Sequence, residues 1–80
     1  MKTTRYFDYM RGRSDRHHIK MEWIEHVVQY PEYESIQSDG RFRFWGRIEE
    51  ANGKILRVIL LADKETVHNA FFDRSFRRPV

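Results

Sequence analysis

The chain has 80 residues, with 15 Lys and Arg against 12 Asp and Glu, a formal net charge of +3, and no cysteine. This length predicts a single domain (1–80), and the lack of cysteine excludes a disulfide framework, a thiolate metal site and a thiol nucleophile. No run of apolar residues is long enough for a signal peptide or a membrane span, so we expect a cytoplasmic protein with no membrane partner.

A short helix is predicted over residues 5–11. Its apolar side chains recur at helical spacing, Thr3 or Thr4 precedes it as an N-cap, and Gly12 follows its last turn. A helix of about two turns does not persist by itself in water. We therefore expect it to pack against the rest of the domain.

A longer amphipathic helix is predicted over residues 21–30. Its apolar face is formed by Trp23, Ile24, Val27 and Val28. Pro31 ends this helix, because the residue before a proline is disfavoured in the helical region. Residues 13–20, which connect the two helices, form the most charged connection of the chain.

An antiparallel meander is predicted after the helices. A short edge strand is expected at 32–37, and three longer strands are placed at 41–50, 54–62 and 66–73. The domain then divides into a helical part (1–31), the meander (32–74) and a basic tail (75–80). These elements indicate an α+β fold, in which one or two N-terminal helices pack on an antiparallel sheet of three to four strands.

The strand at 41–50 separates apolar from cationic side chains. One side carries Phe42, Phe44 and Ile48, and the other carries Arg41, Arg43, Trp45 and Arg47. We expect the helix at 21–30 to cover the apolar side, which leaves the arginine side facing outward. An apolar floor edged by guanidinium groups suits an anionic ligand, and the alternative interpretation is an ordinary solvated strand face.

The turn at Asn52 and Gly53 predicts how the first two long strands pair. Asn-Gly tolerates the positive φ angles of a two-residue hairpin turn. Counting back from that turn places Trp45 opposite Leu60. Because strand side chains alternate, this register decides which residues of the middle strand face the arginines.

His68 and Asn69 interrupt an otherwise apolar strand, and strand alternation sends them to opposite faces. A two-residue loop before the strand puts His68 on the core face and Asn69 beside the arginines, and a three-residue loop reverses the two. The sequence leaves both arrangements open. The structural interpretation of His68 is a buried neutral imidazole bonded to a backbone carbonyl, and the functional interpretation is a general acid or base.

The histidine and the arginines together supply parts of a ribonuclease that needs no metal, since such an enzyme requires a base, an acid and cations around the scissile phosphate. The candidate catalytic residues are His68, Arg47, Arg43 and Arg57. Further candidates for RNA contacts are Arg13, Arg16, His18, Arg41, Trp45, Asn69 and Arg74. The four histidines show no recognised metal spacing, so neither a metal nor another cofactor is expected.

Six motifs mark the chain between about residues 15 and 76: Asp15-Arg16-x-His18-Ile19, Glu22-Trp23-Ile24, Pro31-Glu32, Asp39-Gly40-Arg41, Leu56-Arg57-Val58, and TVHNAFFDR at 66–74. With them the sequence resembles a family of small bacterial proteins of unknown function, which is distantly similar to RelE-like and BrnT-like ribonuclease toxins of toxin-antitoxin pairs. In those toxins helices lie against an antiparallel sheet. The resemblance implies an endoribonuclease that acts on RNA, free or on the ribosome, and that a small cognate antitoxin protein neutralises.

Two other interpretations follow equally from the residues. The arginine face suits docking of an acidic segment of a partner protein without any catalysis. It also suits binding of a nucleic acid without cleavage, which predicts weaker binding at high salt because counterions compete for the phosphates. An endoribonuclease and a non-catalytic binding module are therefore competing hypotheses.

Overall fold

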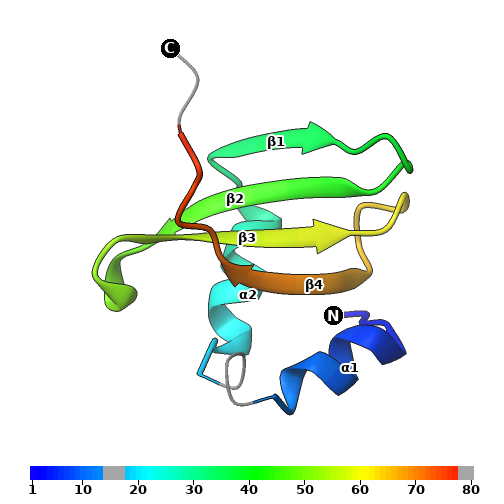
Figure 1. Ribbon diagram of the computed structural model, residues 1–80, viewed down its shortest axis with the longest axis horizontal. Helices are drawn as coiled ribbons and strands as arrows, with labels where there is room; N and C mark the ends of the chain where they lie inside the picture. The colour runs from blue at the N-terminus through cyan, green and yellow to red at the C-terminus, as the bar shows by residue number, and fades with distance from the viewer. Residues whose placement is uncertain (14–17, 78–80) are drawn as a thin grey trace.

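The computed structural model describes residues 1–13 and 18–77. Within these residues the chain forms two α-helices and one four-stranded antiparallel sheet, with the strand order β1-β2-β3-β4 (Figure 1). The elements are α1 (Arg5–Arg11), α2 (Met21–Gln29), β1 (Tyr33–Ile36), β2 (Phe42–Ile48), β3 (Lys54–Leu60) and β4 (Val67–Phe72). The predicted α+β fold is confirmed. None of the described helices has the length and apolar character needed to cross a bilayer.

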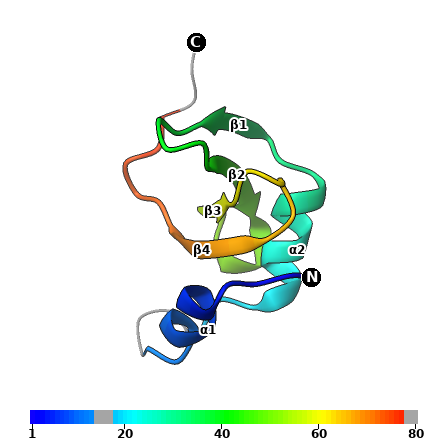
Figure 2. The same cartoon turned by 90° about the vertical axis from the view of Figure 1, so that its right-hand side faces the viewer.

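Different segments of the chain cover the two faces of the sheet. The helix α2 lies against one face, and the segment that follows β4 crosses the opposite face (Figure 2). We call the face opposite α2 the outer face. The helix α1 packs beside β4 at the margin of the sheet (Figure 1). The first strand after the helices, β1, pairs with β2 and forms the other margin.

Both helices begin and end close to their predicted positions. Thr4 caps α1, because its Oγ1 accepts a hydrogen bond from the backbone N of Phe7 at 3.1 Å. The helix α2 has no side-chain cap at Lys20, and it is held instead by Ile24 and Val27, which are fully buried. Helices this short depend on such tertiary packing for their stability.

The hydrophobic core lies between the helices and one face of the sheet. Its buried members are Phe7, Ile19, Ile24, Val27, Phe44, Ile48, Leu56, Val58, Leu60, Val67 and Ala70. The helix α2 approaches β2 so closely at Gly46 that a Cβ atom there would lie 2.9 Å from Cγ2 of Val27. The prediction that the second helix covers the Phe44 and Ile48 side of the strand is confirmed.

The predicted pairing of β2 with β3 is wrong by three residues, because Trp45 lies opposite Arg57 and not opposite Leu60. The cause is a 3-10 turn, η1 (Glu49–Ala51), which lengthens the connection from two residues to residues 49–53. A shift by an odd number of residues moves every side chain of β3 to the other face. Arg57 therefore joins Trp45 on the outer face.

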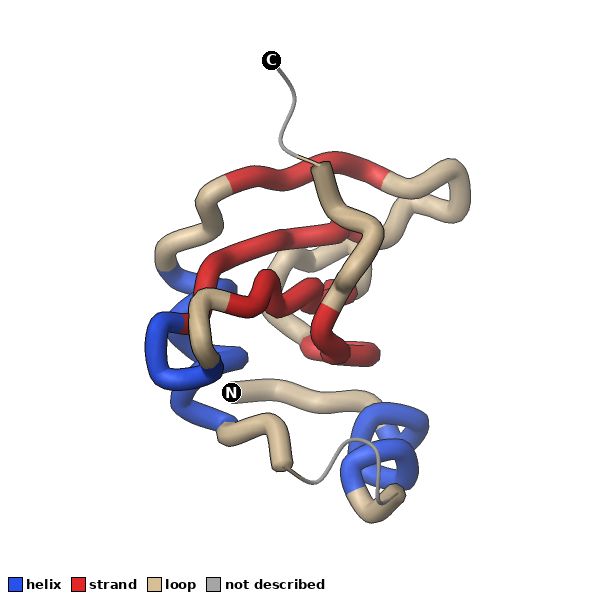
Figure 3. Tube along the Cα trace, turned by 60° about the vertical axis from the view of Figure 1, so that its left-hand side comes forward, coloured by secondary structure: helices blue, strands red, loops and turns tan. Residues whose placement is uncertain are grey.

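The free edge of β4 is covered at its start by the N-terminal segment. Thr3 forms a parallel bridge with Val67, and the backbone N of Thr4 donates a hydrogen bond to the carbonyl O of Val67 at 3.0 Å. Figure 3 shows this segment running beside the sheet before it enters α1. The bridge brings the start of α1 next to His68, the second residue of β4.

Candidate functional site

Aromatic and cationic side chains cover the outer face of the sheet. Trp45 lies at their centre and is 7% exposed, because the ring of Phe76 packs on it with 5.0 Å between centroids and that of Tyr33 with 5.5 Å. Nε1 of Trp45 donates a hydrogen bond to Oδ2 of Asp73 at 3.0 Å. The first residues of the predicted basic tail therefore cover Trp45, a predicted RNA contact.

Arg57 is held among these side chains by two rings and one carboxylate. Its guanidinium lies 5.6 Å from the ring centroid of Trp45 and 5.3 Å from that of Phe71, and its Nη1 lies 3.5 Å from Oδ2 of Asp73. Burial opposes ionisation of Asp73, but hydrogen bonds from Trp45 and Ser75 and the nearby guanidinium lower its pKa below the ordinary value. Arg57 is thus anchored as a fixed cation on the outer face.

Arg43 and Arg47 also belong to the outer face, and each is bound to a neighbour. Nε of Arg43 donates a hydrogen bond to Oγ of Ser35 at 3.0 Å, and its guanidinium lies 5.7 Å from the ring centroid of Trp45. Nε of Arg47 lies 3.0 Å from Oε1 of Glu49. Arg47 lines a hollow with Trp23 and His26 of α2, and Arg43 is not part of that lining, so the two arginines do not meet around this hollow.

A hollow of about 400 Å³ at the start of β4 brings His68 and Arg57 together. Its lining includes Tyr6, Arg41, Arg57, His68, Asn69 and Phe71. We call it the His68 hollow. Asn69 and Val67 pair with consecutive residues of β3, so His68 is the extra residue of a bulge. The bulge interrupts the alternation from which the opposite placement of His68 and Asn69 was predicted, and both residues line this hollow.

Two contacts from the N-terminal part of the chain hold His68 in place. Its Nδ1 lies 3.0 Å from Oγ1 of Thr4, and its ring stacks on Tyr6 with 4.8 Å between centroids. Burial, and next the charge of Arg41, lower the pKa of His68 below its ordinary value of 6.5, whereas Asp39 opposes this shift. The lowered pKa favours the neutral imidazole at neutral pH, and Nε2 of His68 has no hydrogen-bond partner within the described part of the chain.

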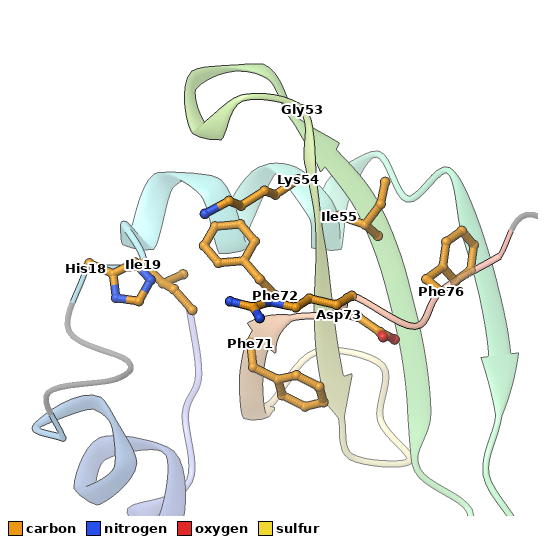
Figure 4. A pocket seen from close by; sticks show the side chains of 10 residues that line it. His18, Ile19, Gly53, Lys54, Ile55, Phe71, Phe72, Asp73 and Phe76 are labelled. Atoms are coloured by element: carbon orange, nitrogen blue, oxygen red, sulfur yellow. The ribbon is translucent and has the colours of Figure 1, made fainter.

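A second hollow of about 540 Å³ lies where β4 ends (Figure 4). Its lining includes His18, Lys54, Phe71, Phe72, Arg74 and Phe76. We call it the Phe72 hollow. It contains two of the predicted RNA contacts, His18 and Arg74, and it shares Phe71 with the His68 hollow.

The other predicted RNA contacts are dispersed. Arg41 and Asn69 line the His68 hollow. Arg13 is exposed at the end of α1, and Arg16 lies outside the described residues. Several residues that line the two hollows were not predicted as contacts, among them Tyr6, Lys54, Phe71, Phe72 and Phe76. Phe71 and Phe72 belong to the 66–74 motif, but nothing in that motif assigns them a contact with RNA. These residues come from segments far apart in the sequence, which meet only in the folded chain.

The described residues contain no group of three or more His, Asp or Glu side chains arranged to hold a metal ion. The fold and its hollows define a small α+β domain with a surface site that combines a neutral histidine with arginines. Comparisons of the chain with protein-family models, with curated proteins and with solved structures gave no significant match. The similarity to ribonuclease toxins therefore stays a prediction.

Proposed function

We propose that this chain is an endoribonuclease of the toxin type, active in the cytoplasm and neutralised by a small antitoxin protein. The observation that carries the proposal is the neutral imidazole of His68 in one hollow with the cations Arg41 and Arg57. A base that is unprotonated at neutral pH and cations near the scissile phosphate are what RNA cleavage by side chains alone requires. Arg43 and Arg47 have no part in the proposed reaction.

In the proposed reaction, Nδ1 of His68 carries a proton and donates it in a hydrogen bond to Oγ1 of Thr4, which leaves Nε2 as the base. Nε2 accepts the proton of a ribose 2′-hydroxyl, and the 2′-oxygen attacks the adjacent phosphorus. The bond to the 5′-oxygen breaks, and this leaving oxygen takes a proton from water. The hydroxide that remains takes the proton from Nε2 of His68, which restores the neutral base. The products are a 2′,3′-cyclic phosphate and a 5′-hydroxyl, and Arg41 and Arg57 offset the charge that develops on the phosphate oxygens.

The test is cleavage of RNA by the purified protein, followed on gels and by detection of cyclic phosphate ends. The change His68→Asn is expected to lower the cleavage rate at least about 100-fold, because general base catalysis contributes about 10²- to 10⁴-fold. The matched control is His26→Asn on α2, outside the His68 hollow, and it should keep the wild-type rate. Equal cleavage by wild type and His68→Asn would refute the proposal.

Expression in bacterial cells gives a second readout of the same proposal. The wild-type chain is expected to stop growth, and co-expression of a cognate antitoxin should restore it. A folded His68→Asn variant should leave growth unaffected. Growth arrest that persists in this variant would place the toxic activity elsewhere in the chain.

A non-catalytic binding module is the second candidate, and the pairing of the arginines favours it. Arg47 is bound to Glu49 and Arg57 to Asp73, so part of the positive charge on the outer face is compensated within the chain. In this case RNA or an acidic segment of a partner protein binds at the surface, and His68 has a structural role. Stable retention of RNA without cleavage products would favour this candidate over the endoribonuclease.

A further inference from the structure

The Phe72 hollow is larger than the His68 hollow, and the proposed cleavage step does not use it. Figure 4 shows His18 and Ile19, from the segment before α2, on one side of it and Phe76 on the opposite side. Phe72 and Lys54 lie between them. A volume of about 540 Å³ falls within the range of small-ligand sites, about 300–1,000 Å³.

The Phe72 hollow carries positive charge that the described residues do not compensate. Within residues 1–13 and 18–77, Lys54 and Arg74 form no ion pair with a carboxylate. The acid of the lining, Asp73, is bound to Arg57 and to Nε1 of Trp45. The charge balance of the hollow is therefore positive, which favours a ligand with phosphate or carboxylate groups.

Aromatic rings lie beside these cations. Nζ of Lys54 is 5.6 Å from the ring centroid of Phe72, and the ring of His18 lies 5.9 Å from the same centroid at an interplanar angle of 26°. Phe71 borders both this hollow and the His68 hollow. Rings next to cations are the combination with which proteins bind single-stranded nucleic acids, because bases stack on the rings while the cations bind phosphates.

We infer that the Phe72 hollow binds a nucleotide of single-stranded RNA next to the one cleaved at the His68 hollow. Lys54 and Arg74 bind the phosphate of this nucleotide, and its base lies against the side of the hollow that Phe72 forms. The position of Phe71 in both linings gives the strand a continuous path between the two sites. The identity of the ligand as RNA rests on the proposed function. The positive charge and the aromatic rings of the hollow are features of the structure and do not depend on that proposal.

The test measures binding of a fluorescent RNA decamer whose 2′-hydroxyl groups are methylated, so that it cannot be cleaved. Lys54→Gln and Arg74→Gln remove one charge each from exposed side chains, and each is expected to weaken binding about tenfold. Each should also lower the slope of log Kd against log salt concentration by about 0.7. With unmodified RNA, the same variants should raise KM and leave kcat unchanged.

The matched control is Lys64→Gln, which removes a charge that is already paired with Glu34 and lies outside both linings. This control should bind the decamer within about twofold of wild type. Melting temperatures of all variants establish that each one is folded.

The outcomes separate this inference from the proposed function. Wild-type affinity in both Lys54→Gln and Arg74→Gln overturns the inference and leaves cleavage at His68 standing. If binding depends on both residues but unmodified RNA is not cleaved, the result supports RNA binding at the Phe72 hollow and contradicts the proposed endoribonuclease activity. A wild-type chain that binds no RNA overturns both. Equally tight binding of an acidic decapeptide would replace RNA by an acidic protein segment as the ligand.

Discussion

The carboxylate of Asp73 is expected to fix the segment after β4 on the outer face. Its side chain is 7% exposed, it accepts a hydrogen bond from Trp45, and it pairs with Arg57, whose side chain is 25% exposed. The change Asp73→Asn keeps the shape and removes the counter-charge of Arg57. Breaking a fully buried pair costs about 3–5 kcal/mol. Because a quarter of Arg57 is exposed, we expect a smaller loss of about 1–3 kcal/mol in the free energy of unfolding.

Urea unfolding followed by tryptophan fluorescence measures this loss. The folded pKa of Asp73 lies below its ordinary value of 3.8, so its stabilisation is present above that pH and is lost as the pH falls through the folded pKa. The difference between wild type and Asp73→Asn should therefore shrink below about pH 4. The control Glu25→Gln, an exposed carboxylate on α2, should change stability by less than about 0.5 kcal/mol.

Two results would refute this reasoning. One is a loss below about 0.5 kcal/mol for Asp73→Asn at pH 7, because it would mean that Arg57 needs no counter-charge. The other is a difference from wild type that stays constant from neutral to strongly acidic pH, because the stabilisation would then not depend on the ionised carboxylate.

Two further predictions concern the packing of α2 and the titration of the histidine. Gly46→Ala should destabilise the fold by about 1–3 kcal/mol in urea unfolding, because the new Cβ would lie 2.9 Å from Cγ2 of Val27. Combining it with Val27→Ala should cost less than the sum of the two single changes, and an additive cost would contradict the clash. His68 should titrate below pH 6.5 by NMR. Since its folded pKa is depressed, its contribution to stability is present above pH 6.5 and is lost as the pH falls through the folded pKa.

The helices and the two faces of β2 follow from short-range patterns in the sequence. Thr4 can cap α1 and Pro31 can end α2 whatever the rest of the chain does, since each acts on backbone groups within one turn. The alternation of Phe44 and Ile48 with Arg43 fixes the faces of one strand in the same local way. For this reason α1 starts and ends as predicted, and α2 ends one residue earlier, at Gln29.

The candidate site was predicted only in part. His68, Arg57, Arg41 and Asn69 were named from their chemistry, and they share one hollow. Their grouping was not predictable, because it depends on the register of β3 and on the bulge in β4. The partner of the imidazole, Thr4, lies 64 residues away in the sequence, and no local pattern indicates that contact.

The sequence by itself determined which segments are helical or extended, which side of β2 is apolar, and which residues carry charges that can bind an anion. The tertiary structure decided which of these residues meet. A 3-10 turn after Ile48 changed the β2–β3 register by an odd number, and a bulge at His68 brought two consecutive side chains to one hollow. Phe76 closed over Trp45. The register, the bulge and the packing of Phe76 depend on contacts between distant segments, whereas a sequence pattern reflects only the preferences of neighbouring residues.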